Sequence, residues 1–118
     1  MKLPLFGQKP AAEDEPYRSI NVDDVKTMLA EGQAEIIDVR EPWEYNAGHV
    51  PGARLAPLNT LLRQPKQFLT RDNLIFICAS GQRSMVASEL AASLGYNQVY
   101  NVLGGTEAWL RKGYPVEK

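Results

Sequence analysis

Residues 74–84 read LIFICASGQRS, and this stretch decides the fold because its two ends follow different patterns. The run LIFI at 74–77 is short, apolar and uninterrupted, which is typical of a parallel strand covered on both faces. The segment SMVASELAASLG at 84–95 instead carries an apolar stripe with the i, i+4, i+8 spacing of a helix, formed by Val86, Leu90 and Leu94. A strand, a tight loop and a helix in this order indicate an α/β protein.

The same alternation of short apolar runs and helical patterns extends to both sides of this stretch. Strands are expected at 17–20, 35–40, 53–56, 74–77 and 98–103. Helices are expected at 21–32, 42–45, 58–62, 84–95 and 104–112, and on the last of them Trp109 and Leu110 are expected to face inward. This order predicts an α/β domain built on a parallel sheet of about five strands.

The length and the charge of the chain exclude several classes of protein. Its 118 residues fit one domain, and 13 basic against 14 acidic side chains give a net charge of -1. The charges form no block of one sign, so the sequence predicts neither a nucleic-acid partner nor a membrane-binding surface. The longest apolar runs are too short to span a membrane. Residues 1–16 lack periodicity, and we expect a flexible leader there and the domain at 17–118.

Cys78 is the only cysteine of the chain. An internal disulfide is therefore impossible, which agrees with a reducing compartment. The N-terminus also has no apolar core of a signal peptide, so we expect a cytoplasmic protein. Because the chain has no second thiol, turnover at Cys78 must use a partner thiol or another acceptor.

Cys78 lies where an expected strand ends and the next helix begins. Unpaired N–H groups and the helix dipole both attract an anion there, and thiols in such positions have a pKa of about 3.5–7.5 instead of about 8.5. Gly81 permits a turn that a side chain would hinder, and Arg83 supplies a planar, charged fork suited to an oxyanion. A cation at a helix start costs about 0.3–1 kcal/mol unless an anion compensates it. The combination favours a reactive cysteine over the alternative, a cysteine buried as a small apolar side chain.

Three segments of the chain carry distinctive motifs: IIDVREPWEYNAGHVPGA at 36–53, CASGQRS at 78–84, and VLGGTEAW followed by GYPV within 102–116. In this order they resemble single-domain rhodaneses, a family of sulfurtransferases. The resemblance implies a five-stranded parallel sheet flanked by helices on both faces. It also implies that a cysteine takes sulfane sulfur from thiosulfate as a persulfide and passes it to cyanide or to a thiol, without a metal or an organic cofactor.

The same resemblance assigns roles to the residues of the loop. Cys78 is the nucleophile, and the backbone N–H groups after it cradle the outer sulfur, while Arg83 holds the sulfonate oxygens of the donor or restrains the loop. From the residues themselves, Ser80 and Gln82 are expected as polar turn residues and Ser84 as a helix cap. The expected substrate-binding set is Ala79, Ser80, Gly81, Gln82, Arg83, Ser84 and, from the neighbouring strand, Arg40.

Two alternatives to a thiosulfate sulfurtransferase are considered. The first is a non-enzymatic relay or sensing module that carries persulfide between protein partners, because the chain has no internal resolving thiol. The second is a cysteine-dependent phosphatase or arsenate reductase. Phosphatases on a related fold place five residues between cysteine and arginine, whereas Cys78 and Arg83 are separated by four. One residue fewer shortens the loop by up to about 3.3–3.6 Å and favours a single sulfur atom over a tetrahedral phosphate.

Other polar residues follow the expected strand at 35–40. Asp38 is expected to cap the adjacent loop or helix, and Arg40 either pairs with an acidic neighbour or assists anionic thiosulfate. His49 could serve as a base for Cys78, but the resemblance places it in a structural turn. One cysteine and one histidine cannot supply the usual ligands of a zinc site. The glycine pair at 104–105 is expected to permit a close backbone turn near the site.

Overall fold

The computed structural model describes residues 16–118, and the leader expected at 1–16 lies outside them except for its last residue. One sheet contains five parallel strands in the order β1-β5-β4-β2-β3. The strands of this described part are β1 Arg18–Ile20, β2 Glu35–Asp38, β3 Arg54–Leu55, β4 Leu74–Ile77 and β5 Val99–Val102. Its helices are α1 Val22–Glu31, α2 Pro42–Ala47, α3 Leu58–Arg63, α4 Pro65–Phe68, α5 Gln82–Ser93 and α6 Gly105–Arg111.

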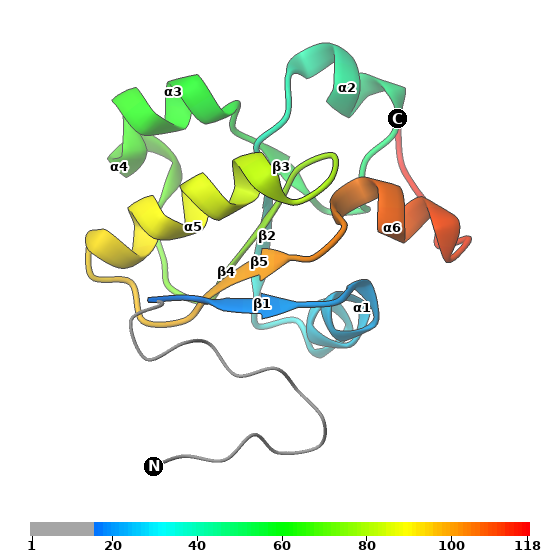
Figure 1. Cartoon of the computed structure of the whole chain (residues 1–118), viewed down its shortest axis with the longest axis horizontal. Helices are drawn as coiled ribbons and strands as arrows, with labels where there is room; N and C mark the ends of the chain where they lie inside the picture. The colour runs from blue at the N-terminus through cyan, green and yellow to red at the C-terminus, as the bar shows by residue number, and fades with distance from the viewer. Residues whose placement is uncertain (1–15) are drawn as a thin grey trace.

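Helices cover both faces of this sheet, which confirms the predicted α/β class. Figure 1 shows α3, α4 and α5 on one side of the sheet and α1 and α6 on the other. The side chains of β4 alternate between these two layers: Leu74 and Phe76 pack toward α3 and α5, and Ile75 and Ile77 pack toward α1 and α6. All four residues of β4 are buried, because this strand pairs with β2 on one side and β5 on the other. The uninterrupted apolar run therefore reflects a central strand.

The start and the end of α1 follow local capping rules. The side chain of Asn21 accepts a hydrogen bond from the backbone N–H of Asp24, whose carboxylate in turn accepts one from the N–H of Asn21. Gly32 ends the helix with φ +79°, a left-handed conformation that glycine adopts without strain. These local signals explain why the sequence predicts the bounds of α1 closely.

The apolar stripe expected on α5 is buried only in part. Leu90 packs against the core, but Val86 and Leu94 are 41% and 45% exposed. The buried residues of α5 are small, namely Ser84, Ala87, Ser88 and Ala91. Their size lets the helix approach β4 and β5 closely, so the inward face of α5 is set by steric fit rather than by hydrophobicity.

Smaller differences concern the ends of elements and one further helix. Leu110 is 53% exposed, so only Trp109 of the expected inward pair on α6 is buried. The additional helix α4 begins at Pro65, where the sequence suggested the end of the preceding helix. Pro is well suited to a first helical position, because its missing N–H would have no partner there.

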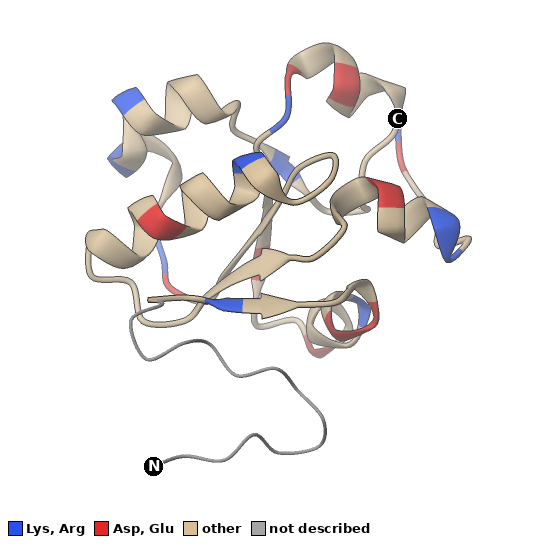
Figure 2. Cartoon of the chain, viewed as in Figure 1, with Lys and Arg blue, Asp and Glu red and all other residues tan. Residues whose placement is uncertain are grey.

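No helix among residues 16–118 is both long and apolar enough to cross a membrane. Figure 2 shows acidic and basic positions interspersed along the chain.

Candidate active site

The cysteine loop, residues 78–84, leaves the carboxyl end of β4 and enters α5. Gly81 is the N-cap of α5 and has φ +112°, a region that side chains rarely permit. The start of α6 supports the loop from behind, since a Cβ atom on Gly105 would lie 2.5 Å from the carbonyl oxygen of Cys78. This close approach confirms the expected role of the glycine pair at 104–105. The N–H and the hydroxyl of Thr106 both donate to the Cys78 carbonyl, at 2.8 and 3.0 Å.

The sulfur of Cys78 is surrounded by hydrogen-bond donors. The backbone N–H groups of Gly81 and Ser84 donate to Sγ at 3.1 and 3.3 Å, and the Ser84 hydroxyl lies 3.3 Å away. Burial raises the pKa of the thiol, but the Ser84 hydroxyl and the N–H groups of Ser84, Gly81 and Ser80 lower it more, so the pKa lies below the ordinary value. The geometry therefore stabilises a thiolate without a neighbouring base.

The sulfur lies at the floor of the loop, because Cys78 is only 1% exposed. The reason is the alternation of the strand: residue 78 follows Phe76 on the face covered by α5, and it joins the same buried cluster. A sulfur donor must therefore present one narrow atom to reach the Cys78 sulfur.

The prediction for Ser84 is wrong, because Ser84 is not the helix cap. It lies inside α5, is fully buried, and donates from its hydroxyl to the side-chain oxygen of Asn101. Asn101 is an asparagine in the middle of buried strand β5 and was missed by the sequence analysis. The polar residue in the run VYNV is the signal that could have found it, because buried amides require partners.

Arg83 is bound by a carboxylate of the chain itself. Its Nη1 and Nη2 donate to Oε1 and Oε2 of Glu44 at 2.8 and 3.0 Å. These hydrogen bonds lower the pKa of Glu44 to about 2, although partial burial raises it. The cation at the start of α5 thus has a compensating anion, and this anion comes from α2. Figure 2 shows acidic positions on α2 and a basic position in the first turn of α5.

Arg40 forms an ion pair with Asp38. Its Nε and Nη2 donate to the two Asp38 oxygens at 3.0 and 2.9 Å, and Nη2 also donates to the carbonyl of Gly48. Asp38 accepts the backbone N–H of Arg40 as well, which agrees with the expected capping of the adjacent loop. Both side chains are buried, at 7% and 0% exposure. Of the two alternatives for Arg40, the structure thus supports the pairing with an acidic neighbour, and its guanidinium holds the loop after β2.

His49 belongs to a packed turn. Its ring stacks on Tyr45 with 3.6 Å between centroids, and Nδ1 lies 2.9 Å from the Tyr45 carbonyl oxygen. Its backbone pairs with Glu117 near the C-terminus. Among the described residues no hydrogen bond joins His49 to Cys78, and no group of three or more His, Cys, Asp or Glu side chains is placed to hold a metal ion.

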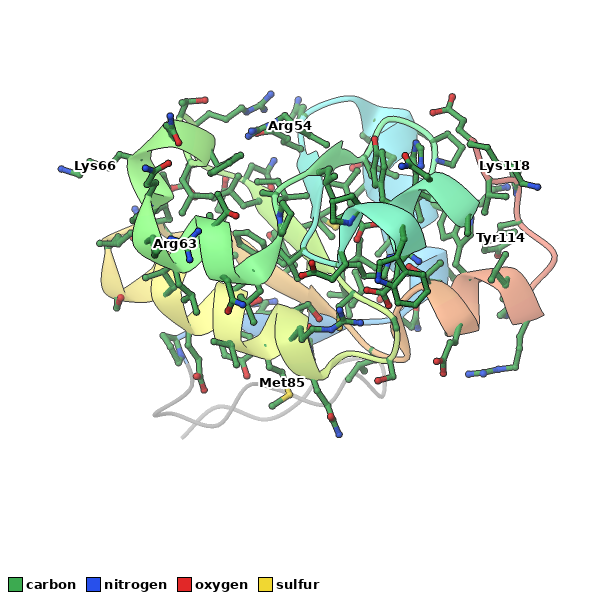
Figure 3. The ribbon with its side chains drawn as sticks, turned by 90° about the horizontal axis from the view of Figure 1, so that it is seen from above. Arg54, Arg63, Lys66, Met85, Tyr114 and Lys118 are labelled. Atoms are coloured by element: carbon green, nitrogen blue, oxygen red, sulfur yellow. The ribbon has the colours of Figure 1, made fainter. Side chains whose placement is uncertain are left out.

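The remaining loop residues take different positions. The carbonyl of Ala79 accepts the N–H of Glu107, so this end of the loop is fastened to α6. Ser80 and Gln82 have exposed side chains. Met85 projects from the first turn of α5 to the surface and is 41% exposed (Figure 3). Trp43, beside Glu44 in the sequence, is 74% exposed. Two large apolar side chains are thus open to solvent next to the residues of the Arg83–Glu44 pair.

Comparison with known proteins agrees with this geometry. The model of the rhodanese-like domain family matches residues 21–112, and the chain belongs to this family. Human thiosulfate:glutathione sulfurtransferase is 32% identical over 108 residues, which cover 80% of this chain and 94% of the relative.

Solved structures show the same fold. A rhodanese-related protein from Thermoplasma volcanium has a TM-score of 0.75 and 38% identity, over 86% of this chain and 98% of that one. A protein from Rhodopseudomonas palustris, described as a possible tyrosine phosphatase, has a TM-score of 0.74 over 94% of this chain and all of its own. Its identity is 24%, so this second likeness concerns the fold alone.

Proposed function

We propose that this protein is a thiosulfate sulfurtransferase that works through a persulfide on Cys78. The observation that carries the proposal is the sulfur of Cys78 at the floor of a loop, with the backbone N–H groups of Gly81 and Ser84 directed at it. Such preorganised donors activate the thiolate and then stabilise the charge of the persulfide. The family and the activity for which the human relative is named support the same class of reaction.

The first half-reaction transfers one neutral sulfur atom. The Cys78 thiolate attacks the outer sulfur of thiosulfate, a new S–S bond forms, and the bond between the two sulfur atoms of thiosulfate breaks. Sulfite leaves with the bonding electron pair, and the persulfide anion remains in the loop. No proton and no external electron is needed, because the charge on the two sides is equal.

The second half-reaction must use an external nucleophile, because Cys78 is the only cysteine. Attack of cyanide or of a thiolate on the outer persulfide sulfur forms thiocyanate or a new persulfide and returns the Cys78 thiolate. We propose a small thiol as the acceptor in the cell. A protein thiol is the other candidate, and the exposed Trp43 and Met85 would offer it apolar contacts.

The size of the loop supports sulfur transfer over phosphate transfer. Only four residues separate Cys78 from Arg83, and the described N–H groups converge on a single sulfur atom. The guanidinium that a phosphatase would use to hold phosphate is paired with Glu44.

Intact mass after incubation with thiosulfate tests the proposal. We expect the wild-type chain to gain the mass of one sulfur atom, and the gain to disappear on addition of cyanide with release of thiocyanate. Cys78→Ser should show neither, with an unchanged thermal unfolding midpoint. A wild-type chain that gains no sulfur would contradict the proposal. A chain that loads from a persulfidated protein but does not turn over thiosulfate would instead indicate the relay.

A further inference from the structure

The Arg83–Glu44 pair lies beside the reactive sulfur and has no role in the steps described above. Both carboxylate oxygens of Glu44 are used, one on each terminal nitrogen of the guanidinium. Glu44 is only 13% exposed, whereas Arg83 is 36% exposed. The carboxylate is therefore the fixed member of the pair, and the guanidinium is the member that solvent and solutes can reach.

The position of Glu44 is itself held by α2. Its Oε1 accepts the backbone N–H of Glu41 at 2.9 Å, which completes a capping box at the start of this helix. Pro42 sits at the first turn and restricts the backbone there. Because the carboxylate is anchored from behind, it cannot follow Arg83 if the guanidinium turns toward a ligand.

The two guanidinium groups described around the cysteine loop are both compensated. Arg40 is paired with Asp38 and Arg83 with Glu44. An anionic donor that needs Arg83 must therefore compete with Glu44 for the guanidinium. The attraction that the donor loses while the guanidinium stays paired is proportional to the charge of the donor.

We propose that Glu44 is a specificity-determining residue that restrains Arg83 and so biases the site toward sulfur donors of low negative charge. This inference rests on the proposed sulfur transfer and names the class of donor that the same site prefers. The persulfide or thiosulfonate group of an organic donor carries one negative charge at most, whereas thiosulfate carries two. Thiosulfate is then a usable donor that the site disfavours because Glu44 restrains Arg83.

The test compares two donors of similar shape and different charge. Methanethiosulfonate replaces one anionic oxygen of thiosulfate by a methyl group and is a monoanion. Attack by the Cys78 thiolate on its outer sulfur forms the same persulfide and releases methanesulfinate, so atoms and charge again balance. The KM of each donor is measured with cyanide as the acceptor.

Glu44→Gln is the informative variant, because a glutamine retains the size and the capping oxygen but not the charge. We expect its KM to fall about five-fold for thiosulfate and about two-fold for methanethiosulfonate, since the gain scales with donor charge. Glu41→Gln is the matched control. It removes the same charge from a side chain that lies one turn away from Glu44 and does not bind Arg83, so both KM values should stay within about 1.5-fold of the wild type.

A double variant separates restraint of Arg83 from a direct effect of the Glu44 charge. In an Arg83→Ala background, Glu44→Gln should lower the KM for thiosulfate no more than the control does. An unchanged or higher KM in Glu44→Gln would overturn the inference. So would an equal effect on both donors, or an effect that persists at full size without Arg83.

A binding experiment distinguishes failure of this inference from failure of the proposed function. Thiosulfate binding is measured by calorimetry on Cys78→Ser, with and without Glu44→Gln, where no sulfur can be transferred. Tighter binding with Glu44→Gln supports the inference even if the wild-type chain never forms a persulfide. Equal binding in the two variants would overturn it even if the wild-type chain is an active sulfurtransferase.

Discussion

The Arg40–Asp38 pair and the Arg83–Glu44 pair lie at the same edge of the sheet, but their surroundings differ. Arg40 and Asp38 are two residues apart in the sequence and are buried together behind β2. Arg83 and Glu44 are 39 residues apart, join α5 to α2, and leave the guanidinium partly exposed. The first pair closes the loop after β2, whereas the second can exchange its carboxylate for another anion. Similar ion pairs thus serve structure in one place and selection of a ligand in the other.

The largest expected effect on stability comes from a substitution that breaks the buried Arg40–Asp38 pair. Arg40→Ala leaves the Asp38 carboxylate buried without its cation, and we expect the free energy of unfolding to fall by about 3–5 kcal/mol. Arg83→Ala is the matched comparison and should cost less than about 1 kcal/mol, because the pair is partly solvated. Both are measured by urea denaturation. Equal losses in the two variants would contradict the distinction between the pairs.

A second prediction asks how far the thiolate depends on the Ser84 side chain. Ser84→Ala removes the hydroxyl next to the sulfur, which lowers the pKa of Cys78, so the pKa of the thiol should rise. The fraction of thiolate at neutral pH then falls, and the rise of kcat/KM with pH should move to higher pH. The ultraviolet absorbance of the thiolate, or the rate of alkylation, measured against pH, follows this change. Ser88→Ala in the same helix is the control, and a pH profile that does not move in Ser84→Ala would show that the N–H groups suffice.

The smallest expected effect is a dependence of the stability on pH in the acidic range. The pKa of Glu44 is lowered from an ordinary 4.5 to about 2 in the folded protein. A lowered folded-state pKa contributes stability that is fully present above the unfolded value and is lost as the pH falls through the folded value. The stability advantage of the wild type over Glu44→Gln should therefore persist at pH 5 and shrink between about pH 4.5 and 2. Urea denaturation across this range measures it, and a difference that does not depend on pH would argue against an ionised pair.

Most of the fold could be predicted from local patterns. These patterns depend on residues that are close together in the sequence. They include the apolar run of β4, the asparagine that caps the start of α1 and the glycine that ends it, and the structure confirms each of them. The exception is α5, where Val86 and Leu94 face solvent and alanines and serines face the sheet. Hydrophobic periodicity misses this face, because the distance between helix and sheet favours small residues over apolar ones.

The site was predicted less completely than the fold. The position of Cys78 between a strand and a helix already indicates a ring of N–H groups, since such donors are a local property of a helix start. Asn101 and Glu44 were not predicted as parts of the site, because their contacts with Ser84 and Arg83 join residues that are far apart in the sequence.

By itself the sequence determined the α/β class, the family resemblance and the place of Cys78 at a helix start. These features depend on residue spacing within short segments, where backbone geometry leaves little choice. Only the tertiary structure decided how deep the sulfur lies, which face of α5 is buried, and which carboxylate each arginine binds. Those outcomes depend on how closely α2, α5 and the sheet pack together, and the packing of distant segments cannot be read from the order of neighbouring residues.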